Sequence, residues 1–98
     1  MKKKYIVSIN GNATAKEDER FSAYLKEKNV GWWHWLSNTW LVVDFLGIVD
    51  AKDLRDKAIE VYKGKNNLVL EVSVGSWFGY GPTTPDRDMF KWIKENWE

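Results

Sequence analysis

One short segment of this chain, GWWHWLSNTW at residues 31–40, is unusually rich in tryptophan. Residues 32–35 read Trp-Trp-His-Trp, and successive side chains of a β-strand point to opposite faces of its sheet. As a strand, this segment places large rings on both faces at once. One face can belong to the core, whereas the other needs a helix, a partner chain or a ligand over it, because exposing so much ring surface to water is unfavourable. The segment therefore predicts a sheet with two apolar faces and, on one of them, a binding surface.

Length and composition describe an ordinary single domain. The chain has 98 residues and a formal net charge of +1, so its bulk charge does not favour a polyanionic partner. It contains no cysteine, which excludes disulfides and thiolate metal sites and agrees with a cytoplasmic location. No apolar run is long enough to span a bilayer, and the N-terminal segment does not resemble a signal peptide. We expect one domain over residues 1–98 and no contact with a membrane.

Hydrophobic periodicity and turn residues predict four strands and three helices. The first two helices begin with capping boxes, formed by Thr14 with Glu17 and by Asp50 with Asp53. In chain order the expected elements are a strand at Lys4–Ile9, a helix from Thr14 to about Lys28, strands at Trp32–Leu36 and Thr39–Leu46, a helix that ends at Gly64, a strand at Leu68–Val74 and a final helix that starts at Thr84-Pro85-Asp86.

This β-α-β-β-α-β order with a C-terminal helix predicts an α+β, ferredoxin-like fold. Such a fold has a four-stranded antiparallel sheet with two helices on one face, and the second face stays uncovered. Because large exposed apolar patches are rare on monomers, we expect this second face to associate with another copy of the chain. A homodimer is the predicted assembly.

His34 and Trp32 are candidate binding residues on the tryptophan-rich hairpin. Strict alternation places Trp32, His34 and Leu36 on one face, opposite Trp33 and Trp35. As the chain's one histidine, His34 is either a general base or ligand contact, or a hydrogen-bonded structural residue of the strand. A single histidine in a chain without cysteine does not make a zinc site.

The loop at residues 75–82 is rich in glycine and aromatic residues. It combines backbone donors and the Ser76 hydroxyl with three rings, among them Trp77 and Tyr80. Such a loop can stack a base or another ring and bind its edge, or it can be a turn that tucks Trp77 over the edge of the sheet. We expect Trp77 and Tyr80 to be partly exposed and to contribute to binding.

Two polar residues bear on metal chemistry. Asn10 ends the first strand, where it can read a polar group but supplies no negative charge for a divalent metal. Asp44 lies in the apolar third strand, and no second acid is close to it in the sequence. We expect Asp44 to face solvent or an interface, and we assign no metal ligand, cofactor or catalytic residue.

Several segments together resemble a known group of small bacterial and phage proteins. The segments are KYIVS at residues 4–8, GWWHWLSNTWLV at 31–42, LRDKA at 54–58, NLVLEV at 67–72 and WIKEN at 92–96. The group is loosely labelled SinR-like. It is similar to the ferredoxin-fold small subunit of the CRISPR spacer-acquisition complex and to the virulence-associated protein D ribonucleases.

The resemblance implies a homodimer in a setting related to nucleic acids or nucleotides, such as phage–host conflict. In the nuclease relatives an aspartate closes the first strand and pairs across the dimer to hold a metal. Asn10 occupies that position here, which argues against metal-dependent cleavage.

These observations lead to one main hypothesis and two alternatives. The main hypothesis is a non-catalytic, dimeric protein that binds a partner, or a small aromatic or nucleotide ligand, through hairpin and loop tryptophans. The predicted binding residues are Trp32, His34, Ser76, Trp77, Tyr80 and Asn10. The alternatives are a metal-dependent endoribonuclease whose acid has shifted to Asp44, and a phage-encoded inhibitor of a host defence system.

Overall fold

The computed structural model describes residues 2–73 and 75–98, and it confirms the predicted fold class. Four strands form one antiparallel sheet in the order β2-β3-β1-β4, and two helices lie between strands in the sequence. The main elements are β1 (Lys3–Ile9), α1 (Ala15–Glu27), β2 (Gly31–Leu36), β3 (Thr39–Asp44), α2 (Ala51–Val61) and β4 (Asn67–Val72). This is the β-α-β-β-α-β order of a ferredoxin-like layout.

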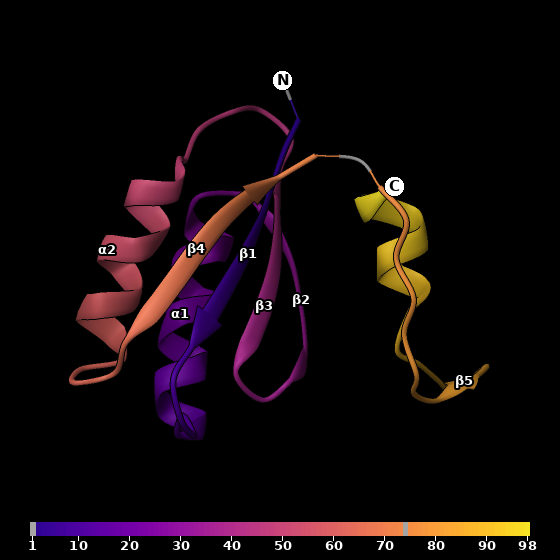
Figure 1. Cartoon of the computed structure of the whole chain (residues 1–98), viewed down its shortest axis with the longest axis horizontal. Coiled ribbons are helices and arrows are strands. Elements are labelled where there is room, and N and C mark those ends of the chain that lie inside the picture. The colour runs from indigo at the N-terminus through magenta and orange to yellow at the C-terminus, as the bar shows by residue number, and fades with distance from the viewer. Residues whose placement is uncertain (1, 74) are drawn as a thin grey trace.

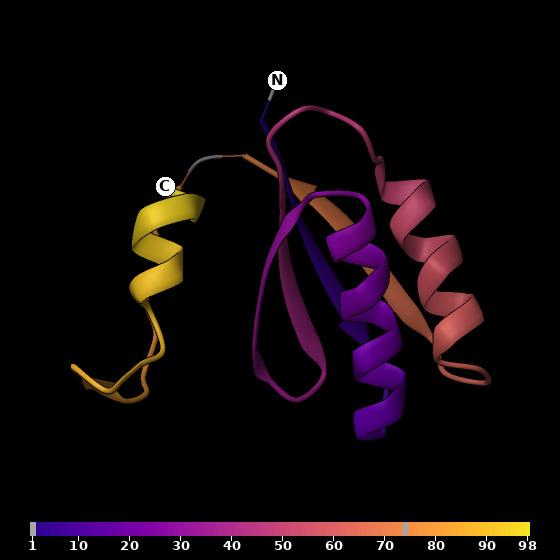
Figure 2. The ribbon, with the colours of Figure 1, turned by 180° about the vertical axis from the view of Figure 1, so that it is seen from behind.

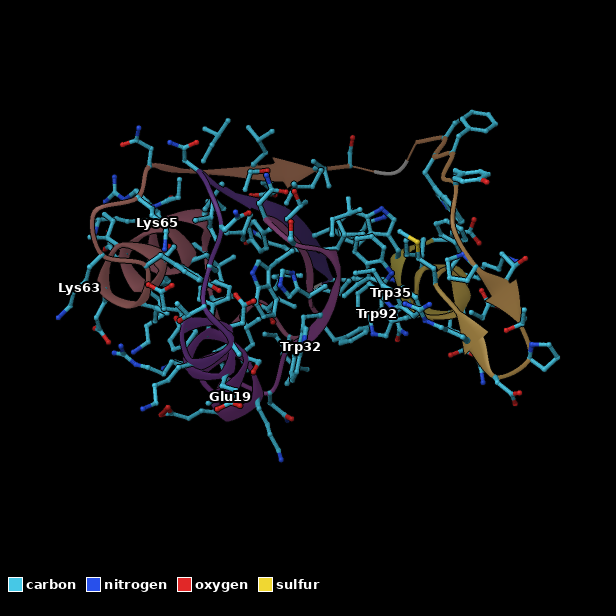
Figure 3. The ribbon with its side chains drawn as sticks, turned by 90° about the horizontal axis from the view of Figure 1, so that it is seen from below. Glu19, Trp32, Trp35, Lys63, Lys65 and Trp92 are labelled. Atoms are coloured by element: carbon cyan, nitrogen blue, oxygen red, sulfur yellow. The ribbon has the colours of Figure 1, made fainter. Side chains whose placement is uncertain are left out.

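The sheet separates two unlike layers (Figures 1 and 2). Helices α1 and α2 lie together on one face, which we call the inner face. Residues 75–98 form a C-terminal arm, which Figure 3 shows on the opposite side of the sheet, the outer face. The arm carries the short strands β5 (Thr83–Thr84) and β6 (Arg87–Asp88) and ends in the π-helical turn η1 (Ile93–Trp97).

Both predicted capping boxes are present. The Thr14 hydroxyl accepts a hydrogen bond from the Glu17 N–H, and the Glu17 carboxylate accepts one from the Thr14 N–H. Asp50 and Asp53 make the same reciprocal pair at the start of α2. These bonds satisfy backbone N–H groups that a helix start leaves free, so each helix begins where the sequence indicates.

The inner face and the helices enclose the main core. Alternate residues of β1 and β3 point into it, and each helix adds one apolar stripe. Its buried members are Tyr5, Val7, Ile9, Phe21, Leu25, Val30, Trp40, Val42, Val49, Leu54, Ala58, Val61 and Tyr62. The Phe21 ring contacts both Trp40 and Tyr62, with ring centres 5.0 and 5.6 Å apart.

A bulge in β2 changes the face of one hairpin residue. The register pairs Trp33 with Leu41 and Leu36 with Thr39, so two residues of β2 lie opposite the single residue Trp40. Strict alternation breaks at such a bulge. The prediction that Leu36 lies on the face opposite Trp33 is therefore wrong, because both side chains line the same space on the outer face.

The third strand is shorter than predicted, and Asp44 is the reason. Strand β3 ends at Asp44, whose buried carboxylate accepts hydrogen bonds from the N–H groups of Leu46, Gly47 and Val49, at 3.2, 2.9 and 2.7 Å. These bonds fold the chain into a loop. The expectation that Asp44 faces solvent or an interface is wrong, since Asp44 is only 1% exposed.

The C-terminal segment also departs from the prediction. Thr84-Pro85-Asp86 starts no helix but forms the turn between β5 and β6, where the Thr84 hydroxyl accepts a hydrogen bond from the Arg87 N–H. Proline suits the second position of a β-turn as well as the first turn of a helix, so the sequence pattern fits both. The helical turns begin at Lys91. The predicted strand at Leu68–Val74 is observed as Asn67–Val72, and Val74 lies outside the described residues.

Candidate binding site

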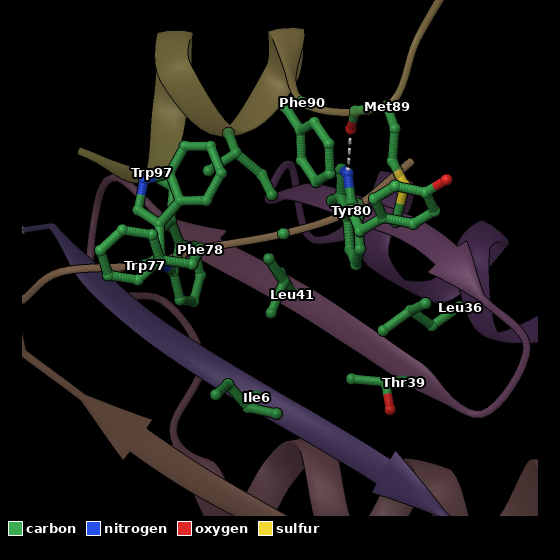
Figure 4. A pocket seen from close by; sticks show the side chains of 13 residues that line it. Ile6, Leu36, Thr39, Leu41, Trp77, Phe78, Tyr80, Met89, Phe90 and Trp97 are labelled. Atoms are coloured by element: carbon green, nitrogen blue, oxygen red, sulfur yellow. Dashed lines mark hydrogen bonds between the residues drawn. The ribbon is translucent and has the colours of Figure 1, made fainter. Parts of the chain in front are cut away.

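The arm docks on the outer face through a small apolar cluster. Its buried residues are Trp33, from β2, and Met89, Phe90 and Ile93, from the arm. The Trp33 indole N–H donates a hydrogen bond to the Met89 carbonyl at 2.6 Å (Figure 4). This bond satisfies the polar atom of a buried tryptophan and fixes the arm over the hairpin.

A second hydrogen bond holds the other end of the arm. The Lys4 ammonium, on the outer face of β1, donates to the Trp97 carbonyl at 2.7 Å and lies 5.6 Å from the centre of the Trp97 ring. Lys4 is buried although it is charged. A cation is favourable at this position because the last carbonyls of a helical turn carry partial negative charge.

Two glycines let the loop at residues 75–82 pack closely against Phe90 and Met89 of this cluster. A Cβ atom at Gly79 would collide with the Phe90 ring, and one at Gly81 would collide with the Met89 sulfur. The glycine-rich composition that marked this loop in the sequence thus serves close packing.

A cavity of about 330 Å³ remains between the arm and the sheet (Figure 4). The sheet supplies its floor and the arm its walls, and none of the described residues that line it is charged. The lining residues are Ile6, Trp33, Leu36, Thr39, Leu41, Trp77, Phe78, Gly79, Tyr80, Met89, Phe90, Ile93 and Trp97. The volume lies in the range of small-molecule sites, which are predominantly apolar and aromatic.

Trp77 and Tyr80, both predicted binding residues, line this cavity. Trp77 is partly buried, with its ring 5.6 Å from Phe90 and its N–H donating to the Glu98 carboxylate at 3.0 Å. Tyr80 and Phe78 are 100% and 96% exposed, so these rings are available for contact without unfolding. Ser76 is exposed and does not line the cavity.

His34 and Trp32 belong to a different part of the molecule. The His34 ring stacks on Trp40 in the inner layer, with ring centres 3.8 Å apart and planes 4° from parallel. Its Nδ1–H donates to the Thr39 carbonyl at 2.9 Å, and its Nε2 lies 3.3 Å from the Asp18 carboxylate. Both ring nitrogens are thus engaged, which supports the structural interpretation of His34. Figure 3 shows Trp32 on the side of the sheet toward α1.

Asp18 links this histidine to the second helix. The Tyr62 hydroxyl donates to Asp18 at 2.7 Å, so one carboxylate contacts residues from β2 and from the end of α2. Burial raises the pKa of Tyr62, and the hydrogen bond to Asp18 raises that pKa further. The network therefore joins the hairpin to both helices.

The structure does not bring the predicted binding residues together. Trp77 and Tyr80 share the cavity, Trp32 and His34 border a hollow beside α1, and Asn10 is exposed at the end of β1. The Asn10 N–H donates to the Asn66 carbonyl at 2.8 Å. Nothing in the sequence indicated that Phe90, Ile6 and Leu41 are neighbours of the loop. No local signal marks them, because their proximity comes from the path of the arm.

Among residues 2–73 and 75–98, no group of three or more histidine, aspartate or glutamate side chains is placed to hold a metal ion. Within the same residues, no helix is long and apolar enough to cross a membrane. Comparisons with protein-family models, curated proteins and solved structures found no match for this chain.

Proposed function

We propose that this protein is a non-catalytic binding protein whose cavity between arm and sheet receives an uncharged, ring-bearing ligand or partner side chain. The observation that carries the proposal is the cavity itself, about 330 Å³ of space lined by aromatic and aliphatic side chains from two separate layers. Rings of this kind favour offset or edge contacts with another ring, and each stacked ring adds about 1–3 kcal/mol to binding.

The uncharged lining of the cavity favours a neutral ligand over a nucleotide. A phosphate group requires Arg, Lys or several free N–H donors around it, and no charged residue lines the cavity. Lys4 is a buried cation beside the arm, but its ammonium already donates to the Trp97 carbonyl. Of the two ligand types that the sequence suggests, the aromatic one fits this cavity better.

The proposal includes a homodimer. The outer face carries Leu68 and Leu70 on β4, which are 60% and 48% exposed, and the arm adds the exposed rings of Phe78 and Tyr80. A fully exposed Phe or Tyr presents roughly 150–250 Å². Together these side chains exceed the few hundred Å² of apolar patch that is usual on a monomer. A second copy that packs on β4 and the arm removes this surface from water.

The environment of Asp44 speaks against the ribonuclease alternative. That alternative needs Asp44 to hold a metal ion, but both of its carboxylate oxygens already accept backbone N–H groups of the following loop. Metal binding there would require these N–H groups, at least one of them buried, to lose their acceptor.

Calorimetric titration with two matched probes tests the ligand class. We expect neutral 1-naphthol to bind at least 10-fold more tightly than 1-naphthyl phosphate, because only the second carries a charge into an uncharged cavity. Tyr80→Ala should weaken naphthol binding several-fold, whereas Ile59→Ala, at an exposed position on α2, should leave it unchanged. Equal binding of both probes, no binding of either, or an equal loss in both variants would contradict the proposal.

Light scattering tests the dimer separately. The wild type should have the mass of a dimer at high micromolar concentration, and Leu70→Lys should shift it to the monomer because the substitution places a charge in the proposed interface. Lys63→Glu, on the surface beyond α2, is the control and should remain dimeric. A wild-type monomer at that concentration would exclude this part of the proposal.

A further inference from the structure

The loop that follows β3 exposes three large apolar side chains. Phe45, Leu46 and Ile48 are 43%, 66% and 50% exposed, although they follow one another within four residues. The buried Asp44 carboxylate holds this loop by three backbone hydrogen bonds, and the Tyr5 hydroxyl donates to the Val49 carbonyl at 3.1 Å. The loop is therefore fixed at both ends while its apolar side chains face outward. Such preorganisation lowers the entropic cost of binding.

A hollow of about 510 Å³ adjoins this loop. It lies between the loop, the end of α1 and the beginning of β2, on residues that do not line the cavity under the arm. Its lining residues are Lys26, Asn29, Val30, Gly31, Trp32, Phe45 and Leu46. Trp32, a predicted binding residue without a place in the arm cavity, forms part of this surface.

Among the described residues, the charged side chain that lines the hollow is a lysine. Lys26 lines it, and the Lys2 ammonium lies 5.6 Å from the centre of the Phe45 ring. No carboxylate lines the hollow, and among the described residues no ion pair of Lys26 is found. Glu98, whose backbone oxygen contacts Lys2, directs its carboxylate to Trp77 on the arm. Lys26 thus remains available to an anionic partner, and the Lys2 ammonium, which donates to the Glu98 backbone oxygen at 3.4 Å, is a second positive charge at the edge of the hollow.

The end of α1 does not cancel this positive charge. Free carbonyls at a helix C-terminus would attract cations. Here the carbonyls of Tyr24, Leu25 and Lys26 accept hydrogen bonds from the N–H groups of residues 28–30. The surface therefore combines satisfied backbone groups, apolar side chains and two lysines.

We propose that this surface docks an acidic, apolar peptide segment of a partner protein. The apolar side chains of the segment pack on Trp32, Phe45 and Leu46, and its carboxylates face Lys26 and Lys2. Complementary charge of this kind sets specificity and association rate, while the buried apolar contacts supply affinity. This docking surface is separate from the arm cavity and does not depend on the ligand proposed there.

Fluorescence anisotropy with three labelled heptapeptides tests the docking surface. One peptide places a Phe-Leu pair between glutamates, the second places the same pair between lysines, and the third places a Ser-Ser pair between glutamates. We expect the first to bind the full-length protein at least 10-fold more tightly than the other two. Lys26→Glu should reverse the preference toward the lysine peptide, and Leu46→Ser should weaken binding of the first peptide several-fold.

Two control variants carry the same changes elsewhere. Lys63→Glu and Ile59→Ser alter exposed residues away from the hollow and should leave all three affinities unchanged. Circular dichroism establishes that each variant is folded. Equal affinity for the acidic and basic peptides, or an unchanged preference in folded Lys26→Glu, would overturn the proposal. Stronger binding to vesicles of anionic phospholipid than to the acidic peptide would also overturn it, because a lipid surface would then be the better partner.

Discussion

The two faces of one sheet are packed in different ways. On the inner face, thirteen buried residues among those described form a continuous core with α1 and α2. On the outer face, the arm buries four residues and leaves a cavity beside them. The side chains on both faces are of the same apolar and aromatic kinds. The difference is that each helix is connected to strands at both ends, whereas the arm follows the last strand of the sheet and is held by a small cluster and a few side-chain hydrogen bonds.

This difference separates stability from binding. A closed core resists change because a lost contact leaves a void. A lightly held segment opens at a lower free energy than the whole fold, and binding elements are commonly of this kind. We infer that the inner face supplies most of the free energy of folding and that the outer face adapts to a ligand.

The largest expected effect comes from truncating one ring on each face. Phe21→Ala removes a fully buried ring from the inner core and should lower the free energy of unfolding by about 3–5 kcal/mol. Phe90→Ala removes the equivalent ring from the outer cluster. We expect it to release the arm while the sheet stays folded. Urea unfolding combined with amide hydrogen exchange measures both, and equal global losses would contradict the comparison.

A substitution of Asp44 tests whether the loop that follows β3 contributes to stability as the inner layer does. Asp44→Ala deprives three backbone N–H groups of their acceptor and should cost about 3 kcal/mol, about 1 kcal/mol for each group, because two of the three are only partly buried. Urea unfolding measures this loss. Asp88→Ala is the matched control on the arm, where the Asp88 carboxylate accepts a single hydrogen bond from the Phe90 N–H. A loss for Asp44→Ala no larger than that of the control would show that the loop is not part of the stable layer.

Tyr62 makes the stability of the inner layer depend on pH in the alkaline range. Burial and Asp18 raise the pKa of Tyr62 above its ordinary value of 10.0, so the folded protein keeps a proton that the unfolded chain loses. The stability from this group is therefore complete below pH 10 and falls as pH rises above 10. Tyr62→Phe should cost about 2 kcal/mol at pH 7, because its hydrogen bond is to a carboxylate, and should flatten the alkaline decline. Unfolding curves from pH 7 to 11 measure both effects, and an unchanged decline in Tyr62→Phe would contradict this prediction.

The smallest expected effect concerns the arm alone. Trp33→Phe retains an aromatic ring in the outer cluster but removes the N–H that donates to Met89. We expect a loss of about 1 kcal/mol, seen as faster hydrogen exchange at residues 89–97 with little change in the sheet. Trp35→Phe, at a partly exposed position of the same strand, is the control. A global loss of several kcal/mol would mean that the arm folds together with the core.

Local signals predicted much of the fold correctly. The capping boxes at Thr14 and Asp50 and the residues between the two strands of the hairpin act over short distances, so they operate in the sequence as they do in the structure. Where two local structures fit the same pattern, the prediction was wrong. The Thr-Pro-Asp segment at residues 84–86 suits a turn as well as a helix start, and the bulge at Trp33–Leu36 has no mark in the sequence.

The candidate site could be predicted only in part. The composition of the loop at residues 75–82 indicated that Trp77 and Tyr80 bind a ligand. No nearby sequence feature indicated that they line the same cavity as Ile6 and Leu41. Trp32 and His34 were grouped with the loop because they are aromatic neighbours in the hairpin. The inner-layer contacts of His34 with Trp40 and Asp18 place that pair elsewhere.

By itself the sequence determined the order of the elements, the starts of the two helices and the need to cover both faces of the hairpin. Only the tertiary structure decided what covers the outer face, where the cavity lies and which aromatic residues line it. The physical reason is distance along the chain. A capping box joins residues three apart, whereas the bond between Trp33 and Met89 joins residues 56 apart, and such a contact depends on the whole path of the chain between them.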